Sequence, residues 1–190
     1  MAVEKQTFGE EDTINEAKDT LERVNSWITQ CDQKSGIMLG IIGVAFSIMI
    51  SLDFIKTYKD VIISGWEYWY GKVLIIAIVL AFFAVVIGTL FLIRTLIPIT
   101  DNKLFKELYI NTRSKIYFDS ISKYDSFKEY KDKFTHFRKQ DYINDLLSQV
   151  YINSQIASKK YKAYKMGMII SLIGFTAFAV LTILIFVLFK

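Results

Sequence analysis

Long runs without a charged side chain alternate with polar stretches along this chain. Three such runs, residues 35–52, 73–93 and 166–189, contain no Asp, Glu, Lys, Arg or His. A helix needs about 20 apolar residues to cross a hydrocarbon core of roughly 30 Å. In hydrocarbon every backbone amide must also bond within its own segment, which favours helices over open strands. The pattern therefore predicts three transmembrane α-helices, of which the first is the shortest.

An amphipathic pattern precedes the first of these spans. Thr13 and Glu16 fit a capping box at the start of a helix, and no proline separates the pattern from the span. We therefore expect one continuous helix that carries its apolar stripe out of the membrane. Apolar residues recur three and four positions apart along that stripe, at Ile14, Ala17, Leu21, Val24, Ile28 and Cys31.

A similar stripe leads into the last span. It consists of Tyr142, Leu146, Leu147, Val150, Tyr151, Ile156, Tyr161 and Tyr164. Shorter patterns at residues 104–110 and 114–124 predict further helices, with a loop around Asp125. The predicted fold is an all-α membrane protein with three transmembrane helices. Its N-terminal helix and the segment between spans two and three form a cytoplasmic helical region.

The distribution of Lys and Arg predicts the orientation, because positively charged flanks stay in the cytoplasm. Residues 100–166 carry fourteen of them, whereas the segment after the first span has few and ends in Trp66, Tyr68, Trp69 and Tyr70. The N-terminus is then cytoplasmic and the C-terminus extracytoplasmic, in a multi-pass membrane protein. The expected parts are an N-terminal amphipathic helix 1–34, span one 35–52, an extracytoplasmic loop 53–72, span two 73–97, a cytoplasmic helical region 98–165 and span three 166–189.

Charge is also uneven between the two cytoplasmic parts. Residues 1–36 have eight acids and four bases, and residues 100–166 have fourteen bases and eight acids. Two interpretations follow: the parts dock on each other, or the basic segment is held near anionic lipid.

Small residues are spaced three and four positions apart along each span, which lets helix backbones approach closely. The expected helix-packing positions are Gly36, Gly40, Gly43, Ser47, Ala77, Ala81, Ala84, Gly88, Gly167, Ser171 and Gly174. These contacts lie either within one chain or between copies in a homo-oligomer.

The candidate chemistry is sparse. His136 is the single histidine and Cys31 the single cysteine, so no His-based or multi-thiolate metal site is expected. No glycine-rich phosphate loop or zinc-protease motif is present, and no catalytic residue, metal, cofactor or nucleic acid partner is expected. We expect no enzyme. The spans also lack the ionisable residues that mark proton relays and ion-coupled transport, which argues against a secondary transporter.

Three groups of residues, in order along the chain, resemble the transmembrane effectors of Pycsar antiphage systems. The first group is Trp27, Ile28, Asp32, Lys34, Ser35, Gly36, Leu39 and Gly40. The second is Tyr117, Phe118, Ile121, Ser122, Glu129 and Tyr130. The third is Asp145, Leu146, Gln149, Tyr151, Ser154, Lys160 and Tyr161.

The resemblance implies an antiphage effector that responds to cyclic UMP or cyclic CMP, made by a pyrimidine cyclase, and impairs the inner membrane in abortive infection. A cyclic-oligonucleotide signal stays open. A cyclic phosphate favours a cation for the phosphodiester and an aromatic face for the base. The candidate ligand-binding residues are Trp27, Asp32, Lys34, Gln149, Lys160 and Tyr161, with Asp32 expected to pair with Lys160.

Two other functions fit the same stripes and charges. A membrane scaffold would dock a partner protein without sensing a nucleotide. A constitutive holin-like toxin would kill without any signal. Otherwise the expected partners are the lipid bilayer, further copies of the chain and, functionally, a nucleotide cyclase.

Overall fold

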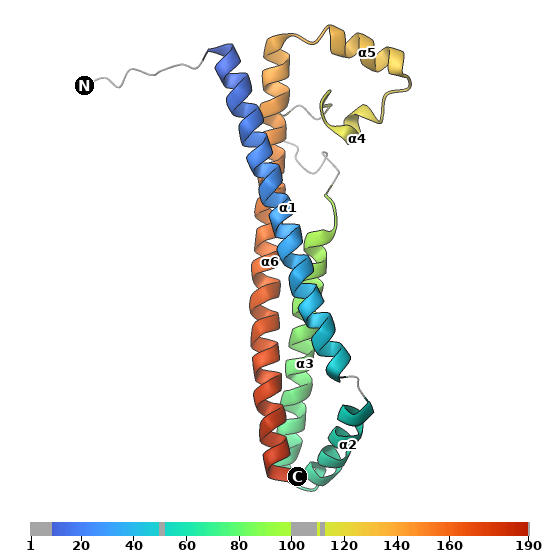
Figure 1. Cartoon of the computed structure of the whole chain (residues 1–190), viewed down its shortest axis with the longest axis vertical. Helices are drawn as coiled ribbons and strands as arrows, with labels where there is room; N and C mark the ends of the chain where they lie inside the picture. Colours follow the sequence, from blue (N-terminus) through green and yellow to red (C-terminus); the bar gives the residue numbers. More distant parts are fainter. Residues whose placement is uncertain (1–8, 50–51, 100–109, 111–112, 190) are drawn as a thin grey trace, which may run out of the picture. The chain divides into compact units, whose positions relative to one another are not determined.

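The computed structural model describes residues 9–49, 52–99, 110 and 113–189. These residues form helices and no strand (Figure 1). The helices are α1 Glu10–Met49, α2 Leu52–Trp66, α3 Trp69–Leu96, α4 Phe118–Ile121, α5 Phe127–Thr135 and α6 Lys139–Phe189. The chain divides into two compact units: unit 1 takes in residues 1–30 and 98–159, and unit 2 residues 31–97 and 160–190. Helices α1 and α6 each contribute residues to both units.

Helix α1 begins three residues before the predicted capping box. Its first helical residue is Glu10, and the Thr13 hydroxyl donates to the carbonyl of Gly9 at 3.0 Å instead of capping the helix. The prediction of a cap at Thr13 was therefore wrong. The acids Glu10, Glu11 and Asp12 fill the first turn, where the helix dipole stabilises negative charge, so the helix extends over them. The predicted continuity of this helix into residues 35–49 is confirmed.

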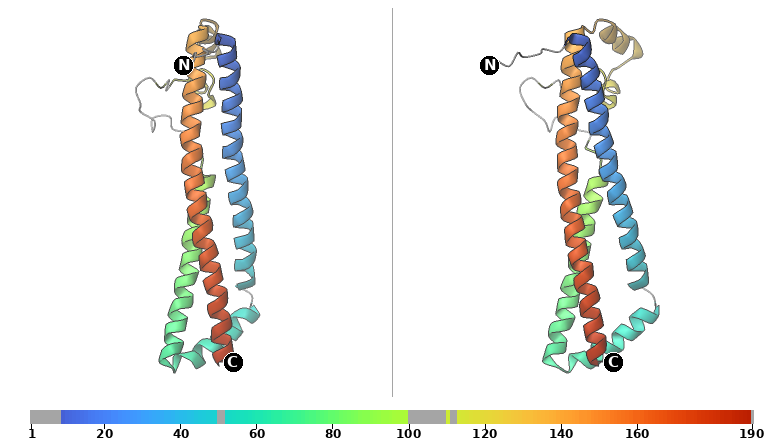
Figure 2. Two further views of the ribbon diagram at one scale, coloured as in Figure 1. Left: turned by 90° about the vertical axis from the view of Figure 1, so that its left-hand side faces the viewer. Right: turned by 60° about the vertical axis from the view of Figure 1, so that its left-hand side comes forward.

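In unit 1 the first part of α1 lies along the first part of α6 (Figures 1 and 2). The predicted stripe of α1 faces inward, with Ala17 and Val24 buried and Ile28 packed on Ile152 and Ile156. The Asn153 amide donates to Asn25 Oδ1 at 2.8 Å across a sequence separation of 128 residues. Two heptads earlier, at the same separation, Lys139 pairs with Glu11 at 3.7 Å. A repeat of whole heptads is the geometry of a parallel coiled-coil pair.

The stripe of α6 is rotated from its predicted position. Leu147 and Tyr151 are 46% and 39% exposed, so their assignment to the buried stripe was wrong. Ile143 and Ile152 are buried instead, together with Leu146. The period alone did not choose between the two faces, because both carry apolar residues.

The segment between spans two and three is less helical than predicted. Of residues 114–124 only Phe118–Ile121 form a helix. The backbone amides of residues 115–117 bond to the side chains of Asp145 and Ser114 instead of to helical carbonyls. The loop around Asp125 is confirmed, and α5 follows it, with the Ser126 side chain accepting from the Glu129 amide. The pattern predicted at 104–110 lies outside the described residues except for Ile110, which is not helical.

In unit 2, α3 and α6 approach each other through small residues. A Cβ added at Gly88 would lie 2.3 Å from Ser171 Oγ and 2.9 Å from the Gly167 carbonyl, and one added at Gly174 would lie 2.9 Å from the Val85 amide. Ala81, Gly88, Gly167, Ser171 and Gly174 are accordingly buried. The backbones meet where larger side chains would hold them apart.

The small residues of α1 behave differently. A Cβ added at Gly36, Gly40 or Gly43 would meet nothing within 4 Å. In unit 2, α1 packs through large side chains instead: Ile42 is buried against Val85 and Leu92, and Met38, Leu39 and Phe46 surround them. Within one chain the glycine face of α1 is therefore open.

Residues 53–72, predicted as a loop, are mostly the helix α2. Its residues Tyr58, Val61 and Gly65 recur at helical spacing and face α3 and α6: Tyr58 Oη lies 2.9 Å from Thr182 Oγ1, and Val61 is buried with Ile78. The lysines of this segment masked its apolar stripe. Helix α3 then ends at Leu96, before Pro98, because the residue preceding a proline disfavours helical dihedrals.

Two of the described helices, α3 and α6, are long and apolar enough to cross a membrane, with mean hydropathies of 3.1 and 2.8 over their most apolar windows. Only 22% and 11% of those windows are buried, whereas the core helix of a soluble domain is mostly buried. The described part of the first predicted span ends with α1 at Met49, and these fifteen residues reach only about 22 Å.

Replacing Gly88 by Ala tests the backbone contact between α3 and α6. The new methyl group would clash with Ser171, so we expect a loss of about 1–3 kcal/mol of stability, measured as a lower unfolding midpoint in detergent micelles. Gly40→Ala, on the open face of α1, is the matched control and should leave the midpoint unchanged or slightly raised. Equal effects of the two substitutions would contradict the contact.

Candidate functional site

Asp32 and Lys160 form an ion pair in unit 2. Lys160 Nζ lies 2.6 Å and 2.8 Å from the two carboxylate oxygens of Asp32, as the sequence led us to expect. The lysine is only 5% exposed, whereas the Asp32 side chain is 34% exposed. A buried ammonium group without a partner is strongly unfavourable, so the position of Lys160 on α6 depends on Asp32 on α1.

Two buried residues of α1 lie beside this pair. Cys31 and Ser35 have no exposed surface. Burial, and after it the negative charge of Asp32, raises the pKa of the Cys31 thiol. The thiol therefore stays protonated and unreactive, which fits its expected role as an apolar member of the stripe.

The other predicted ligand residues are not joined to this pair. Lys34 is exposed and Tyr161 partly exposed, and within the described residues no hydrogen bond or ion pair links either to Asp32 or Lys160. Trp27 and Gln149 belong to unit 1. Of the six predicted residues, the structure thus brings together two.

Trp27 lines an open hollow on one face of α1 with a volume of about 380 Å³. Its other lining residues are Asp19, Glu22, Arg23 and Ser26. The indole is half exposed, and the Arg23 guanidinium is held by Glu16 at 2.8 Å and by Thr20 at 2.7 Å. All five lining residues lie on α1, so the hollow is an open surface of one helix. The hollow offers an aromatic face, a cation and carboxylates that can accept a hydrogen bond from a hydroxyl group.

A second polar group lies inside unit 1, and sequence reasoning missed its centre, Asp145. This carboxylate is fully buried, and its Oδ2 accepts from the Lys115 amide at 2.8 Å. Next to it, Ser114 Oγ accepts from the amides of Ile116 and Tyr117. The bond from the Lys115 amide attaches this segment to α6, and the bonds to Ser114 form a local turn in place of a helical one. The available signal was the spacing, since Asp145 and Gln149 are one turn apart on the inward face.

Asp145 and Gln149 each have a side-chain atom that makes no hydrogen bond among the described residues. Within the described residues, Asp145 Oδ1 and Gln149 Nε2 are buried and without a hydrogen-bond partner. Burial raises the pKa of Asp145 above its ordinary value of 3.8, and the bond from the Lys115 amide opposes that rise. A buried polar atom without a partner is costly, so protonation of the carboxyl relieves part of the cost.

Asp145→Asn tests this description through pH. Folding raises this pKa, so the folded chain binds the proton more tightly, and the resulting stability is present below pH 3.8 and lost as the pH rises through the raised value. The asparagine side chain of the variant does not titrate. The melting temperature of the variant relative to that of the natural chain should therefore rise between acid and neutral pH.

Asp141→Asn is the matched control on the same helix. Its hydrogen bond from Arg138 lowers the pKa of Asp141, so this carboxylate stabilises the folded chain above its ordinary pKa. The melting temperature of that variant relative to the natural chain should fall as the pH rises. A fall for the Asp145→Asn variant as well would show that Asp145 is not a buried acid with a raised pKa.

Comparison with known proteins gives one consistent family. The profile of the Pycsar effector protein domain matches residues 16–188. The chain is also 28% identical over 174 residues to the Pycsar effector protein GmPycTM of Gulbenkiania mobilis, covering 86% of this chain and 88% of that protein. No solved structure matches.

The matched region takes in α2 to α5 completely, nearly all of α6 and all but the first turns of α1. It therefore contains the Asp32–Lys160 pair, the Trp27 hollow and the buried Asp145, in an all-helical chain with two membrane-span candidates. The chain belongs to the Pycsar effector family, whose members are effectors of antiphage defence.

Proposed function

We propose that this protein senses a cyclic nucleotide, cyclic UMP or cyclic CMP, through its cytoplasmic helices and then impairs the bacterial inner membrane. The infected cell would die before the phage is released, which is abortive infection. The observation that carries the proposal is the match of residues 16–188 to the Pycsar effector domain, together with two helices suited to a bilayer. The activity requires no catalytic residue, metal or cofactor of the chain itself.

Three spans are part of the proposal. Ile37, Ile41, Val44 and Ile48 of α1 are each more than half exposed in unit 2, where water would disfavour them and lipid would not. In the proposal, residues 35–52 provide the first crossing. The basic residues between α3 and α6 then place the N-terminus and this segment in the cytoplasm, with the C-terminus outside.

Unit 1 supplies the sensor in this proposal. The Trp27 hollow offers an indole for stacking on a base, the Arg23 guanidinium for the phosphodiester and carboxylates for the ribose hydroxyl. Residues of unit 1 and of unit 2 follow one another along the same two helices, α1 and α6. A ligand that displaces α1 against α6 therefore acts on helices that continue to the Asp32–Lys160 pair and into the apolar segments.

Energetics favour an assembly of several copies. A ligand must bind the active state more tightly than the resting state by about 5.5 kcal/mol to reverse a 99:1 equilibrium. One solvent-exposed hollow supplies little of that difference. In a symmetric homo-oligomer each copy binds one ligand, and the separate differences in binding free energy add.

The direct test is dye release from liposomes that contain the purified protein. Cyclic UMP, cyclic CMP and a cyclic dinucleotide are added separately, and leakage with one of them establishes the gated effector and names its signal. No leakage with any nucleotide, in protein shown to be folded, would favour a membrane scaffold. Leakage without any nucleotide would identify a constitutive holin-like toxin.

Substituting Asp32 or Lys160 by Ala tests the coupling between α1 and α6. We expect the nucleotide response to be lost while the protein is still made and inserted. Asp32→Ala should also lower the melting temperature more, because it leaves a buried ammonium unpaired, which costs about 3 kcal/mol or more, whereas Lys160→Ala leaves a carboxylate that water reaches.

Gln33→Ala serves as the control for this pair, since Gln33 is exposed on the same turn of α1. Toxicity in cells that make the nucleotide and leakage from liposomes are the two measurements. If Asp32→Ala and Lys160→Ala both respond like the natural chain, the pair has no part in gating.

A further inference from the structure

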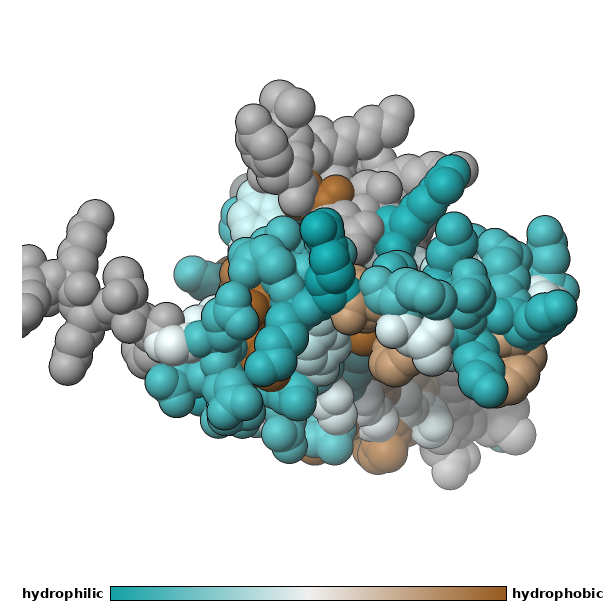
Figure 3. All heavy atoms as spheres, turned by 90° about the horizontal axis from the view of Figure 1, so that it is seen from above, coloured by the Kyte–Doolittle hydropathy of each residue, from teal (hydrophilic) through white to brown (hydrophobic). Residues whose placement is uncertain are grey.

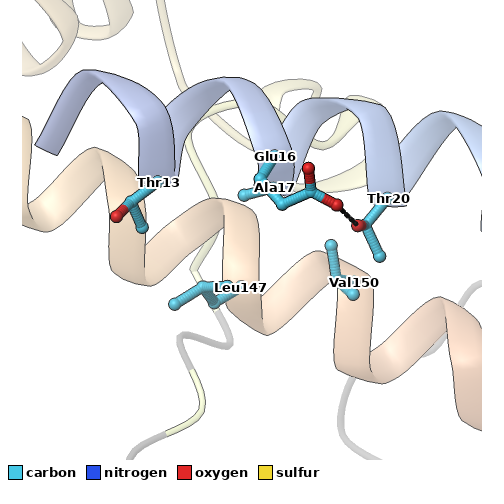
Figure 4. A pocket seen from close by; sticks show the side chains of 6 residues that line it. All are labelled: Thr13, Glu16, Ala17, Thr20, Leu147 and Val150. Carbon is cyan, nitrogen blue, oxygen red and sulfur yellow. Dashed lines mark hydrogen bonds between the residues drawn. The ribbon is translucent and has the colours of Figure 1, made fainter. Parts of the chain in front are cut away.

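A second hollow of unit 1 lies between α1 and α6. Thr13, Glu16, Ala17 and Thr20 line it from α1, and Leu147 and Val150 from α6 (Figure 4). Its volume is about 150 Å³, too small for a nucleotide. An apolar cavity of about this volume does accept a benzene ring. The hollow is therefore the size of one phenyl side chain.

The lining of this hollow combines apolar side chains with an acidic one. Ala17, Leu147 and Val150 are apolar, and Leu147 is 46% exposed on α6. Glu16 lies at the rim, where its carboxylate accepts from Thr20 and pairs with Arg23. Residues 10–30 of α1 carry six acids and two bases. A side chain that fits here has an apolar ring and a positively charged neighbour.

The same unit exposes such a side chain on α5. Phe127 is 78% exposed, more than any other phenylalanine of the described residues. Lys128 follows it directly and Lys131 lies one turn later on the same side of the helix, and both are exposed. The face seen in Figure 3 is largely hydrophilic, with few hydrophobic side chains. A phenyl ring that is exposed to water in such surroundings is unfavourable, and an exposed apolar group of this kind often marks an interaction site.

Phe127 does not occupy the hollow of its own chain, because its ring is exposed and the lining contains no residue of α5. Phe118 and Phe134, the other exposed rings nearby, already lie against Tyr117 and Tyr130 respectively. Phe127 makes no such ring contact within the described residues. The described part of each chain thus offers an apolar hollow with an acidic rim and an exposed phenylalanine with basic neighbours.

We infer that Phe127 of one copy inserts into the α1–α6 hollow of a second copy, with Lys128 facing the acidic side of that copy's α1. This contact assigns an interface to the homo-oligomer of the proposed function, and to that extent rests on it. Because the ring and the hollow are on different parts of the chain, every copy offers both. Contacts of this kind either close between two copies or continue around a ring.

Cross-linking between two differently tagged full-length copies tests the contact. One copy carries Phe127→Cys and the other Leu147→Cys, and they are mixed in bicelles and oxidised. A disulfide-linked heterodimer is expected. The matched control replaces Phe118 by Cys, on another exposed ring of the unit, and should give no heterodimer with Leu147→Cys; nor should the natural chain, because Cys31 is buried.

Self-association provides a second measurement. Phe127→Ala should weaken it by about tenfold or more, as truncation of a central aromatic anchor does, while Phe118→Ala should not. Lys128→Glu should weaken it as well, and Glu16→Lys in the partner copy should restore it. Phe127 is exposed, so its replacement leaves the fold intact.

Three outcomes would overturn the inference. The first is absence of the heterodimer while the control proteins are folded and associated. The second is efficient cross-linking within one chain that carries both cysteines at high dilution, which would show that the chain's own α5 covers the hollow. Burial of Phe127 in anionic vesicles by monomeric protein would likewise replace the second copy by lipid.

The result is separable from the proposed function. Neither cross-linking nor self-association requires a nucleotide, so these measurements test the interface independently of the proposed signal. If the interface forms but no nucleotide causes leakage, the proposed signal fails and the inference survives. If nucleotides cause leakage equally in Phe127→Ala, the function survives and the inference fails.

Discussion

The close approach of two helix backbones supports everything else in unit 2. Gly88 of α3 faces Gly167 and Ser171 of α6, and Gly174 faces Val85, at distances where an added methyl group would overlap the neighbouring chain. Helices in lipid gain no hydrophobic driving force from meeting each other, so van der Waals contact and hydrogen bonds must hold them. Because glycine has no side chain, the two backbones are in direct van der Waals contact at Gly88, Gly167 and Gly174. Against this pair, α1 and α2 pack through larger residues such as Ile42 and Val61, whose positions depend on where the pair already is.

Charges inside the two units are handled in different ways. In unit 2 the buried Lys160 is neutralised by a carboxylate on the other long helix, so the pair connects α1 and α6 directly. In unit 1 the buried Asp145 accepts the backbone amide of Lys115, and burial raises its pKa. The first arrangement fixes two helices to each other, and the second fixes a non-helical segment to a helix. Both lie on α6, one in each unit.

Helices α1 and α6 contribute residues to both units, so the proposed coupling between ligand and membrane runs along these two helices. The surfaces that could bind a ligand, a partner or lipid differ between the two units. Unit 1 has the polar hollow at Trp27 and the apolar hollow between α1 and α6, suited to a small ligand and to a side chain. Unit 2 has the open glycine face of α1 and the exposed aliphatic residues of its helices, suited to lipid or to another helix.

The sequence by itself determined the helical class, the apolar segments, the inward stripe of α1 and the family, because these depend on local periodicity, on length and on residues in order along the chain. It also allowed the Asp32–Lys160 pair to be expected, since opposite charges occupied corresponding places before two spans. Only the tertiary structure decided which face of α6 is buried, where Leu147 and Ile143 were equally apolar. It also showed that α2 is a helix and that Asp145 is buried. Those outcomes depend on which distant residues arrive opposite a given position, and no local period contains that information.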